Sequence, residues 1–125
     1  RGGGGDGDER VSSVRLQSFA GADTFHPHGL YVTNTRVFVV NHGATDGGDR
    51  SRGPREAVEV FRRTADVNVL EHEATVRSEH MLHINDVAAV TDDEFYVTNW
   101  LYYSNDEPLR MGVEMLGRFP WTNFL

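Results

Sequence analysis

Two stretches of this chain, residues 28–42 and 85–100, follow the same pattern. With one gap, each runs from a polar pair through an apolar strand, a polar turn and a second apolar strand to an asparagine. Asn85 follows His28 by 57 positions, and Asn99 follows Asn41 by 58. Short strands that recur at about this period indicate successive blades of a β-propeller, whose usual period is roughly 40–50 residues. Equivalent positions of successive blades meet around one axis, so two distant polar motifs can build a single site.

Apolar patterning fills in the rest of this all-β architecture. A strand is predicted within residues 11–19. Four strands are predicted at 30–32, 36–41, 57–63 and 68–76, which is the content of one blade. Residues 87–90 and 94–98 open a second blade, and 121–125 begin its third strand. Pro108 suits a first helical turn, and Leu109, Val113 and Leu116 recur at helical spacing, so a short helix is predicted over 108–118.

The domain organisation follows from these elements. Residues 1–10 are rich in Gly and Asp and are predicted to be a linker, and residues 11–125 are predicted to be a partial propeller domain. The chain begins at Arg1 and ends within an aromatic run at 119–125, so both ends are interpreted as cuts in a longer protein. The alternative is a small α+β domain complete in itself, which the inserted helix and the ending within a strand disfavour.

Composition excludes several classes of function. The chain has 12 basic and 19 acidic residues, a net charge of −7, and no cluster of basic residues, which disfavours nucleic-acid binding. It contains no cysteine, which excludes disulfides, thiolate catalysis and Cys-ligated zinc. No apolar run approaches the roughly 18 residues that a membrane span requires. The acidic excess suits a soluble surface or a site for a hard cation.

Two histidines stand at strand ends where a base is useful. His28 precedes Gly29 at the mouth of a strand, and an imidazole with a pKa of about 6.5 can act as a base near neutral pH. His42 follows Asn41 at the end of a strongly apolar strand and could orient a first histidine or relay its proton. The structural alternatives are a turn histidine that packs on Phe25 and an Asn-His-Gly turn that only closes the strand.

Asn85 and Asp86 offer two hard oxygens of the kind that calcium prefers. Alternation along a strand sends the two side chains to opposite sides, where they could serve different ions. The alternative is an Asx turn that leads into the strand. The repeat makes His28 and Asn85 equivalent positions that point to one axis, and a cation on Asn85 beside a histidine base is a hydrolytic pairing. The remaining histidines of the polar stretch, His72, His80 and His83, are expected to be solvated.

Five segments with matching order and spacing resemble the serum paraoxonase/arylesterase family. They are residues 25–29, 39–42, 57–61, 84–90 and 94–99, and the similarity runs from about residue 24 to the end of the chain. The resemblance implies a six-bladed β-propeller with two calcium ions in its central tunnel. It also implies hydrolysis of lactones and aryl esters as small-molecule substrates, with some members cleaving organophosphate triesters.

The resemblance also assigns roles to single residues. His28 matches the family's proposed general base, and His42 matches its partner in a dyad. Asn85 matches a ligand of the catalytic calcium, whereas Asp86 and the backbone carbonyl of Leu30 match ligands of the structural calcium. The implied mechanism is a metal-polarised carbonyl attacked by water that His28 deprotonates. A segment of this length would lack most calcium ligands and is expected to be poorly active in isolation.

The sequence departs from the family pattern after Asn99. The family usually shows Asp-His-Tyr there, whereas this chain has Trp100-Leu101-Tyr102 at positions that border the substrate pocket. The family's helix matching 109–116 is linked to lipid particles or membranes, which implies association with a lipid surface and an extracellular or membrane-associated location. Two alternatives remain: a non-catalytic, calcium-stabilised propeller that acts as a binding or lipid-associated module, and a related propeller with another hydrolytic or lyase chemistry.

Overall fold

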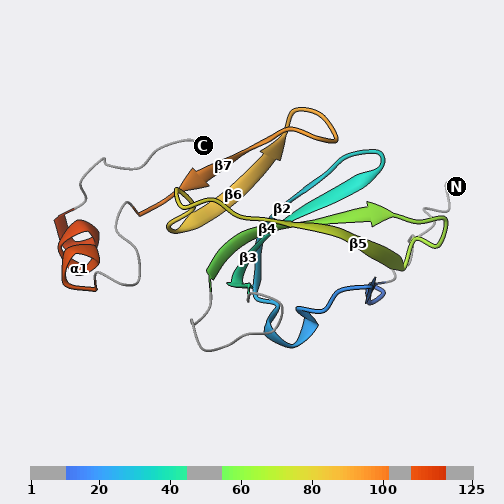
Figure 1. Ribbon diagram of the computed structural model, residues 1–125, viewed down its shortest axis with the longest axis horizontal. Coiled ribbons are helices and arrows are strands. Elements are labelled where there is room, and N and C mark those ends of the chain that lie inside the picture. Colours follow the sequence, from blue (N-terminus) through green and yellow to red (C-terminus); the bar gives the residue numbers. More distant parts are fainter. Residues whose placement is uncertain (1–10, 45–54, 102–107, 118–125) are drawn as a thin grey trace, which may run out of the picture.

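A computed structural model describes residues 11–44, 55–101 and 108–117, and the statements below concern those residues. The chain forms two β-sheets and one α-helix, α1 (Pro108–Gly117), which lies beyond the end of the second sheet (Figure 1). A five-stranded sheet has the order β1-β5-β4-β3-β2, and a two-stranded sheet pairs β6 with β7. The strands are β1 (Arg15–Gln17), β2 (Pro27–Val32), β3 (Arg36–Ala44), β4 (Arg55–Arg63), β5 (Val69–Val76), β6 (Ile84–Ala89) and β7 (Phe95–Asn99), and a 3-10 turn, η1, spans Ala22–Thr24.

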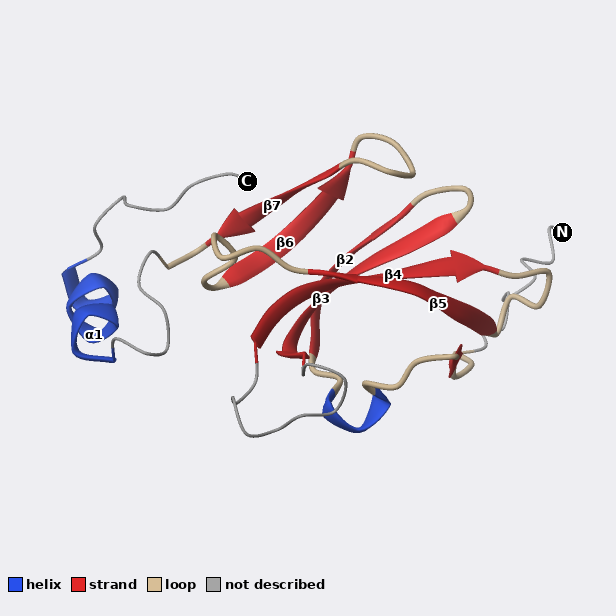
Figure 2. Ribbon diagram, in the orientation of Figure 1, coloured by secondary structure: helices blue, strands red, loops and turns tan. Residues whose placement is uncertain are grey.

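The first sheet contains one propeller blade. Strands β2 to β5 form an antiparallel meander, and β1 adds to its outer edge in parallel with β5. The β6–β7 hairpin opens the next blade, with β6 against β2, so the first strands of the two blades are neighbours (Figure 1). Strands dominate and the two sheets do not close on themselves (Figure 2). The all-β propeller fragment with one short helix is therefore confirmed.

Strand boundaries differ from the prediction where they matter most. β2 begins at Pro27 and β6 at Ile84, each about three residues earlier than expected, so His28 and Asn85 lie within their strands and not before them. The helix at Pro108–Gly117 is where its spacing placed it. The predicted linker at 1–10 and the predicted strand at 121–125 lie outside the described residues.

Both faces of the blade are buried because its central strands are apolar on both sides. Facing the second blade, residues of β3 and β4 pack against β6 and β7 in a cluster of Phe38, Val40, Val58, Val60, Ile84, Val87 and Val97. On the opposite face, Val37, Val39 and Phe61 pack against Leu16, Phe19, Phe25 and Leu70. Burial of apolar area on each side contributes about 25 cal/mol per Å². The two-faced burial of β3 is as the sequence predicted.

Two buried asparagines reproduce the sequence repeat at atomic level. Oδ1 of Asn41 accepts a hydrogen bond from the backbone N–H of His26 at 3.0 Å. Oδ1 of Asn99 accepts one from the backbone N–H of His83 at 3.4 Å. Asn41 thus fixes His26, two positions before His28. Asn99 fixes His83, two positions before Asn85.

The backbone that follows each asparagine repeats as well. The N–H of His42 donates to the carbonyl of His26 at 3.1 Å, and the N–H of Trp100 donates to the carbonyl of His83 at 2.9 Å. Trp100 is therefore the counterpart of His42 in the second blade. The repeat is a shared hydrogen-bonding frame, and the side chains that it carries differ.

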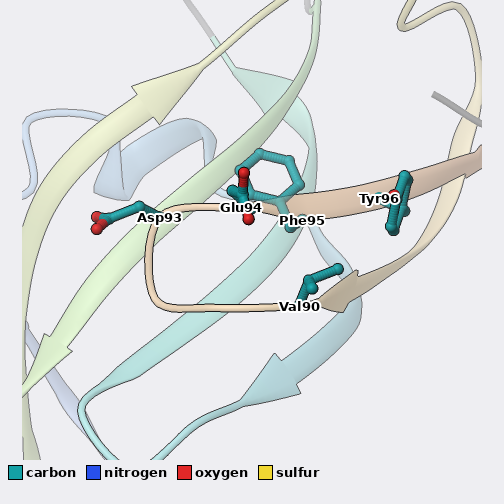
Figure 3. Close-up of a pocket in the computed structure, with 5 residues that line it drawn as sticks. All are labelled: Val90, Asp93, Glu94, Phe95 and Tyr96. Carbon is teal, nitrogen blue, oxygen red and sulfur yellow. The ribbon is translucent and has the colours of Figure 1, made fainter.

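Polar side chains join the blades at the opposite end of β6. The carboxylate of Asp92 accepts hydrogen bonds from the hydroxyls of Thr35 at 2.5 Å and Thr33 at 2.7 Å. These bonds, that from Thr35 first, hold the pKa of Asp92 below its ordinary value. Arg36 donates to Asp93 at 2.6 Å. The turn therefore links to the first blade. A pocket of about 370 Å³ lies beside it, and Figure 3 shows the residues that line it: Val90, Asp93, Glu94, Phe95 and Tyr96.

Candidate active site

Three β-bulges gather at one end of the two blades. The register shifts between Pro27 and Leu30 in β2, between Asn41 and Ala44 in β3, and after Ile84 in β6. A bulge inserts one unpaired residue, bends the strand and re-aims a side chain. The predicted polar motifs, with His28, His42 and Asn85, fall within these three irregular stretches. The bulges therefore explain why these side chains depart from strict alternation.

The bulge in β6 overturns one prediction. Alternation predicted that Asn85 and Asp86 point to opposite sides of a regular strand. Instead, Ile84 and Val87 are both buried, and Asn85 and Asp86 between them are both exposed. The extra residue shifts the phase by one, so Asn85 and Asp86 both lie outside the apolar cluster, and they contact His28 and Gly29 of β2.

Gly29 allows β2 and β6 to approach each other closely. A Cβ at this position would lie 2.6 Å from the carbonyl oxygen of Asn85 and 2.6 Å from Oδ1 of Asp86. No real side chain fits at that distance, so a glycine is required for close approach of the backbones. The contact places the residue next to His28 directly against the polar pair of the second blade.

The predicted base and the predicted metal ligand meet. Nε2 of His28 lies 3.0 Å from Oδ1 of Asn85, although 57 positions separate them in the sequence. An amide oxygen only accepts, so Nε2 carries the hydrogen and neutral His28 keeps its lone pair on Nδ1. The ring of His42 meets that of His28 edge to face, with centroids 5.1 Å apart. The structure thus brings His28, His42 and Asn85 together.

Glu56 belongs to the same cluster, and sequence reasoning missed it. Its carboxylate oxygens lie 2.7 Å and 3.0 Å from Nδ1 of His42. Its Oε2 also accepts a hydrogen bond from the backbone N–H of Ile84 at 3.3 Å. The signal was present in the sequence: Glu56 shares a strand face with Val58 and Val60, so the alternation places a carboxylate at the end of an apolar face that meets the next blade.

A pocket of about 410 Å³ collects these side chains. It is lined by His28, His42, Glu56, His83, Asn85 and Trp100. Trp100, a predicted pocket residue, is half exposed. The neighbouring Leu101 is buried and is not among the lining residues, so it contributes to packing.

The prediction that His72, His80 and His83 are solvated holds only for His80, whose side chain is 68% exposed. His72 pairs with the buried carboxylate of Glu59 at 2.8 Å. His83 is 8% exposed and its ring meets that of Trp100. Both corrections come from tertiary packing: a polar stretch of sequence folds back onto the blade.

The side chains of Asn85 and Asp86 and the carbonyl of Leu30 supply oxygen atoms of the types that calcium binds. Asn85 supplies an amide oxygen, Asp86 a carboxylate that packs against Gly29, and Leu30 a carbonyl one residue further along β2. Oδ1 of Asp86 also accepts from the N–H of Val87 at 2.9 Å. Among the described residues, no group of three His, Cys, Asp or Glu side chains is arranged to hold a metal. These residues would therefore form part of a ligand set and require further oxygens.

The strand order and the pocket between first strands define a segment of a β-propeller with a histidine-lined site. A family model described as Arylesterase matches residues 6–125. The chain belongs to the arylesterase family.

Curated relatives agree with this assignment. The chain is 31% identical to serum paraoxonase/arylesterase 2 of Gallus gallus over 91% of its own length and 30% of that relative. It is 30% identical to serum paraoxonase/arylesterase 1 of Mus musculus over 80% of its length and 26% of that relative. It is 23% identical to serum paraoxonase/lactonase 3 of Homo sapiens over 93% of its length and 31% of that relative. The chain therefore spans about 30% of the length of these proteins.

Proposed function

We propose that the full-length protein containing this chain is a calcium-dependent hydrolase of aryl esters and lactones. Membership in the arylesterase family supports ester substrates. The contact between His28 and Asn85 is the observation that carries the proposal, because it sets a base beside an oxygen ligand for a hard cation. Asp86 and the carbonyl of Leu30 would hold a second, structural calcium. Extracellular or membrane-surface location is proposed on family grounds.

The proposed chemistry is attack of water on the ester carbonyl. Calcium bound at Asn85 would supply polarisation of that carbonyl. His28 removes a proton from water at Nδ1, and the hydroxide adds to the carbonyl carbon. His28 passes this proton to His42, which delivers it to the leaving oxygen as the ester C–O bond breaks. Trp100 forms one wall of the pocket beside these groups.

His28 is the residue whose replacement tests this function. In the full-length protein, His28→Gln should lower kcat for phenyl acetate about 10²- to 10⁴-fold, the usual contribution of a general base. The melting temperature should change little, since His28 is exposed. EDTA should abolish turnover, and added calcium should restore it. Full activity of the metal-free protein would contradict the proposal.

A second candidate is a non-catalytic propeller that associates with lipid surfaces. It is favoured by α1, where Leu109 and Leu116 are 82% and 89% exposed and Val113 lies on the same helical face. No described helix has the length and apolar character needed to cross a membrane. Replacing His28 and His42 separates the candidates: an enzyme loses rate and keeps its melting temperature, whereas a structural pair loses melting temperature.

A further inference from the structure

The side chain of Glu56 is only 9% exposed, yet it lines the pocket. It is the single carboxylate among the described residues of the pocket lining. It lies on the face of β4 that packs against the second blade, in phase with Val58 and Val60. A buried carboxylate is costly unless donors satisfy it, so its partners indicate its role.

The first partner is Nδ1 of His42, 2.7 Å from Oε2. An ionised carboxylate only accepts hydrogen bonds, so the hydrogen of neutral His42 resides on Nδ1 and its lone pair on Nε2. The same contact fixes the ring's rotation about its χ angles. A histidine that relays a proton needs both a defined tautomer and a defined orientation.

The second partner is the backbone N–H of Ile84, one residue before Asn85. A single carboxylate therefore joins β4 to both His42 of its own blade and the start of the bulge in the next blade. Displacing it would loosen the ring of His42 and the backbone beside Asn85 together.

Glu59, three residues along the same strand, shows what a purely structural carboxylate looks like. It accepts from Asn41 at 2.8 Å, His72 at 2.8 Å and Thr75 at 2.5 Å, and it is 2% exposed. The odd spacing sends it to the opposite face of β4, away from the pocket. Glu56 differs because its histidine partner also lines the pocket beside His28.

We propose that Glu56 is a positioning residue for the reaction: it acts through His42, whose tautomer and orientation it sets, and it holds the start of β6 in register with that ring. This inference rests on the proposed function, since it assumes that His42 relays a proton. Glu56 is then the fourth member of the cluster, beside His28, His42 and Asn85.

The test uses the full-length protein and the variants Glu56→Ala, Glu56→Gln and Glu56→Asp. Glu56→Ala should lower kcat for phenyl acetate about 10- to 100-fold, the usual cost of losing an orienting partner, with KM within about twofold. Glu56→Asp should recover part of the loss. Glu56→Gln should be intermediate, because its amide oxygen still accepts from Nδ1 but carries no charge; it serves in place of Glu56→Ala should that variant fail to fold.

A second readout does not depend on turnover. Long-range ¹H–¹⁵N NMR with ¹⁵N-histidine, at about pH 8 where an ordinary imidazole is neutral, reports the tautomer of His42. The wild-type protein should show Nδ1–H, and Glu56→Ala should lose that preference. Glu59→Gln is the matched control: it should lower the melting temperature and leave both kcat and the His42 tautomer unchanged.

Two outcomes would overturn the positioning role: kcat of Glu56→Ala within twofold of wild type, or a fall in kcat that tracks the melting temperature while the His42 tautomer stays unchanged. Failure of the proposed function looks different. In that case the wild-type protein lacks esterase activity and His28→Gln changes nothing, while the tautomer measurement alone still supports or overturns the action of Glu56 on His42.

Discussion

In the first blade Asn41 fixes the entry to β2, and in the second Asn99 fixes the entry to β6. The same backbone bond follows each asparagine, and a bulge lies at the start of each first strand. At the equivalent positions of this hydrogen-bonding frame, the first blade has His28 and His42, and the second blade has Asn85 and Trp100. The first blade thus provides the candidate base, and the second provides an oxygen ligand and an aromatic wall.

The comparison separates residues that build the frame from residues that define the chemistry. Asn41 and Asn99 are buried, and the Oδ1 atom of each accepts hydrogen bonds from backbone N–H groups. The side chains at the bulges face the pocket and are free to differ. A repeated frame can therefore place unlike groups side by side, as the contact of His28 with Asn85 shows.

The largest expected effect comes from removing the frame itself. Asn41→Ala leaves the N–H groups of His26 and Gly43 without their acceptor and takes a donor from the buried Glu59. It should lower the free energy of unfolding by about 3–5 kcal/mol. The described partners of the Asn99 side chain are backbone groups of Leu82, His83 and His80, so Asn99→Ala should cost about 2–3 kcal/mol.

Chemical denaturation of the full-length variants measures this difference. Asn34→Ala, at an exposed turn position, is the control and should leave the free energy of unfolding nearly unchanged. Equal losses for the two buried asparagines would mean that Glu59 adds nothing to the frame of the first blade.

A smaller effect is expected where the counterparts differ in chemistry. We expect Trp100 to bind the substrate as part of the pocket wall, whereas His42 transfers a proton. Trp100→Ala should therefore raise KM for phenyl acetate about fivefold and leave kcat nearly unchanged. A fivefold rise corresponds to the loss of an aromatic contact of about 1 kcal/mol. An aliphatic lactone should show a smaller rise, and Trp100→Phe should retain most of the affinity. Steady-state kinetics on both substrates would refute the assignment if kcat, and not KM, carried the loss.

The smallest effect is expected at the far end of the blades, where Asp92 accepts from Thr35 and Thr33. The folded-state pKa of Asp92 is lowered, so its contribution to stability is present above the unfolded pKa and is lost as pH falls through the folded pKa. Asp92→Asn should therefore lower the melting temperature slightly at neutral pH, and the difference should vanish in acid. A difference that persists at acid pH would exclude the carboxylate as its source.

Local patterning was sufficient to predict the strands of the first blade, the helix at Pro108–Gly117 and the equivalence of His28 with Asn85. Apolar runs and alternation report burial directly, because each strand must place its apolar side chains in a core. The repeat then placed two residues from distant parts of the chain near one axis. The contact between them agrees with that expectation.

The same patterning failed where long-range packing sets the backbone. The bulge at Asn85 accompanies the close approach at Gly29, and this shifted the phase on which the opposite-sides prediction relied. His72 and His83 lie in a polar stretch, yet folding brings one to Glu59 and buries the other beside Trp100. A window of sequence contains no information about partners that arrive from another strand.

The sequence by itself determined the alternating strands, the repeated frame and the types of group available: two imidazoles, an amide and carboxylates. Only the tertiary structure decided which of them meet. Glu56 and not Glu59 is the carboxylate of the pocket, because Glu56 lies on the face of β4 that packs on the second blade. Contacts with Ile84 and Val87 set which face of β4 this is. Side-chain identity is local, whereas the neighbour of a side chain depends on how the two blades pack together.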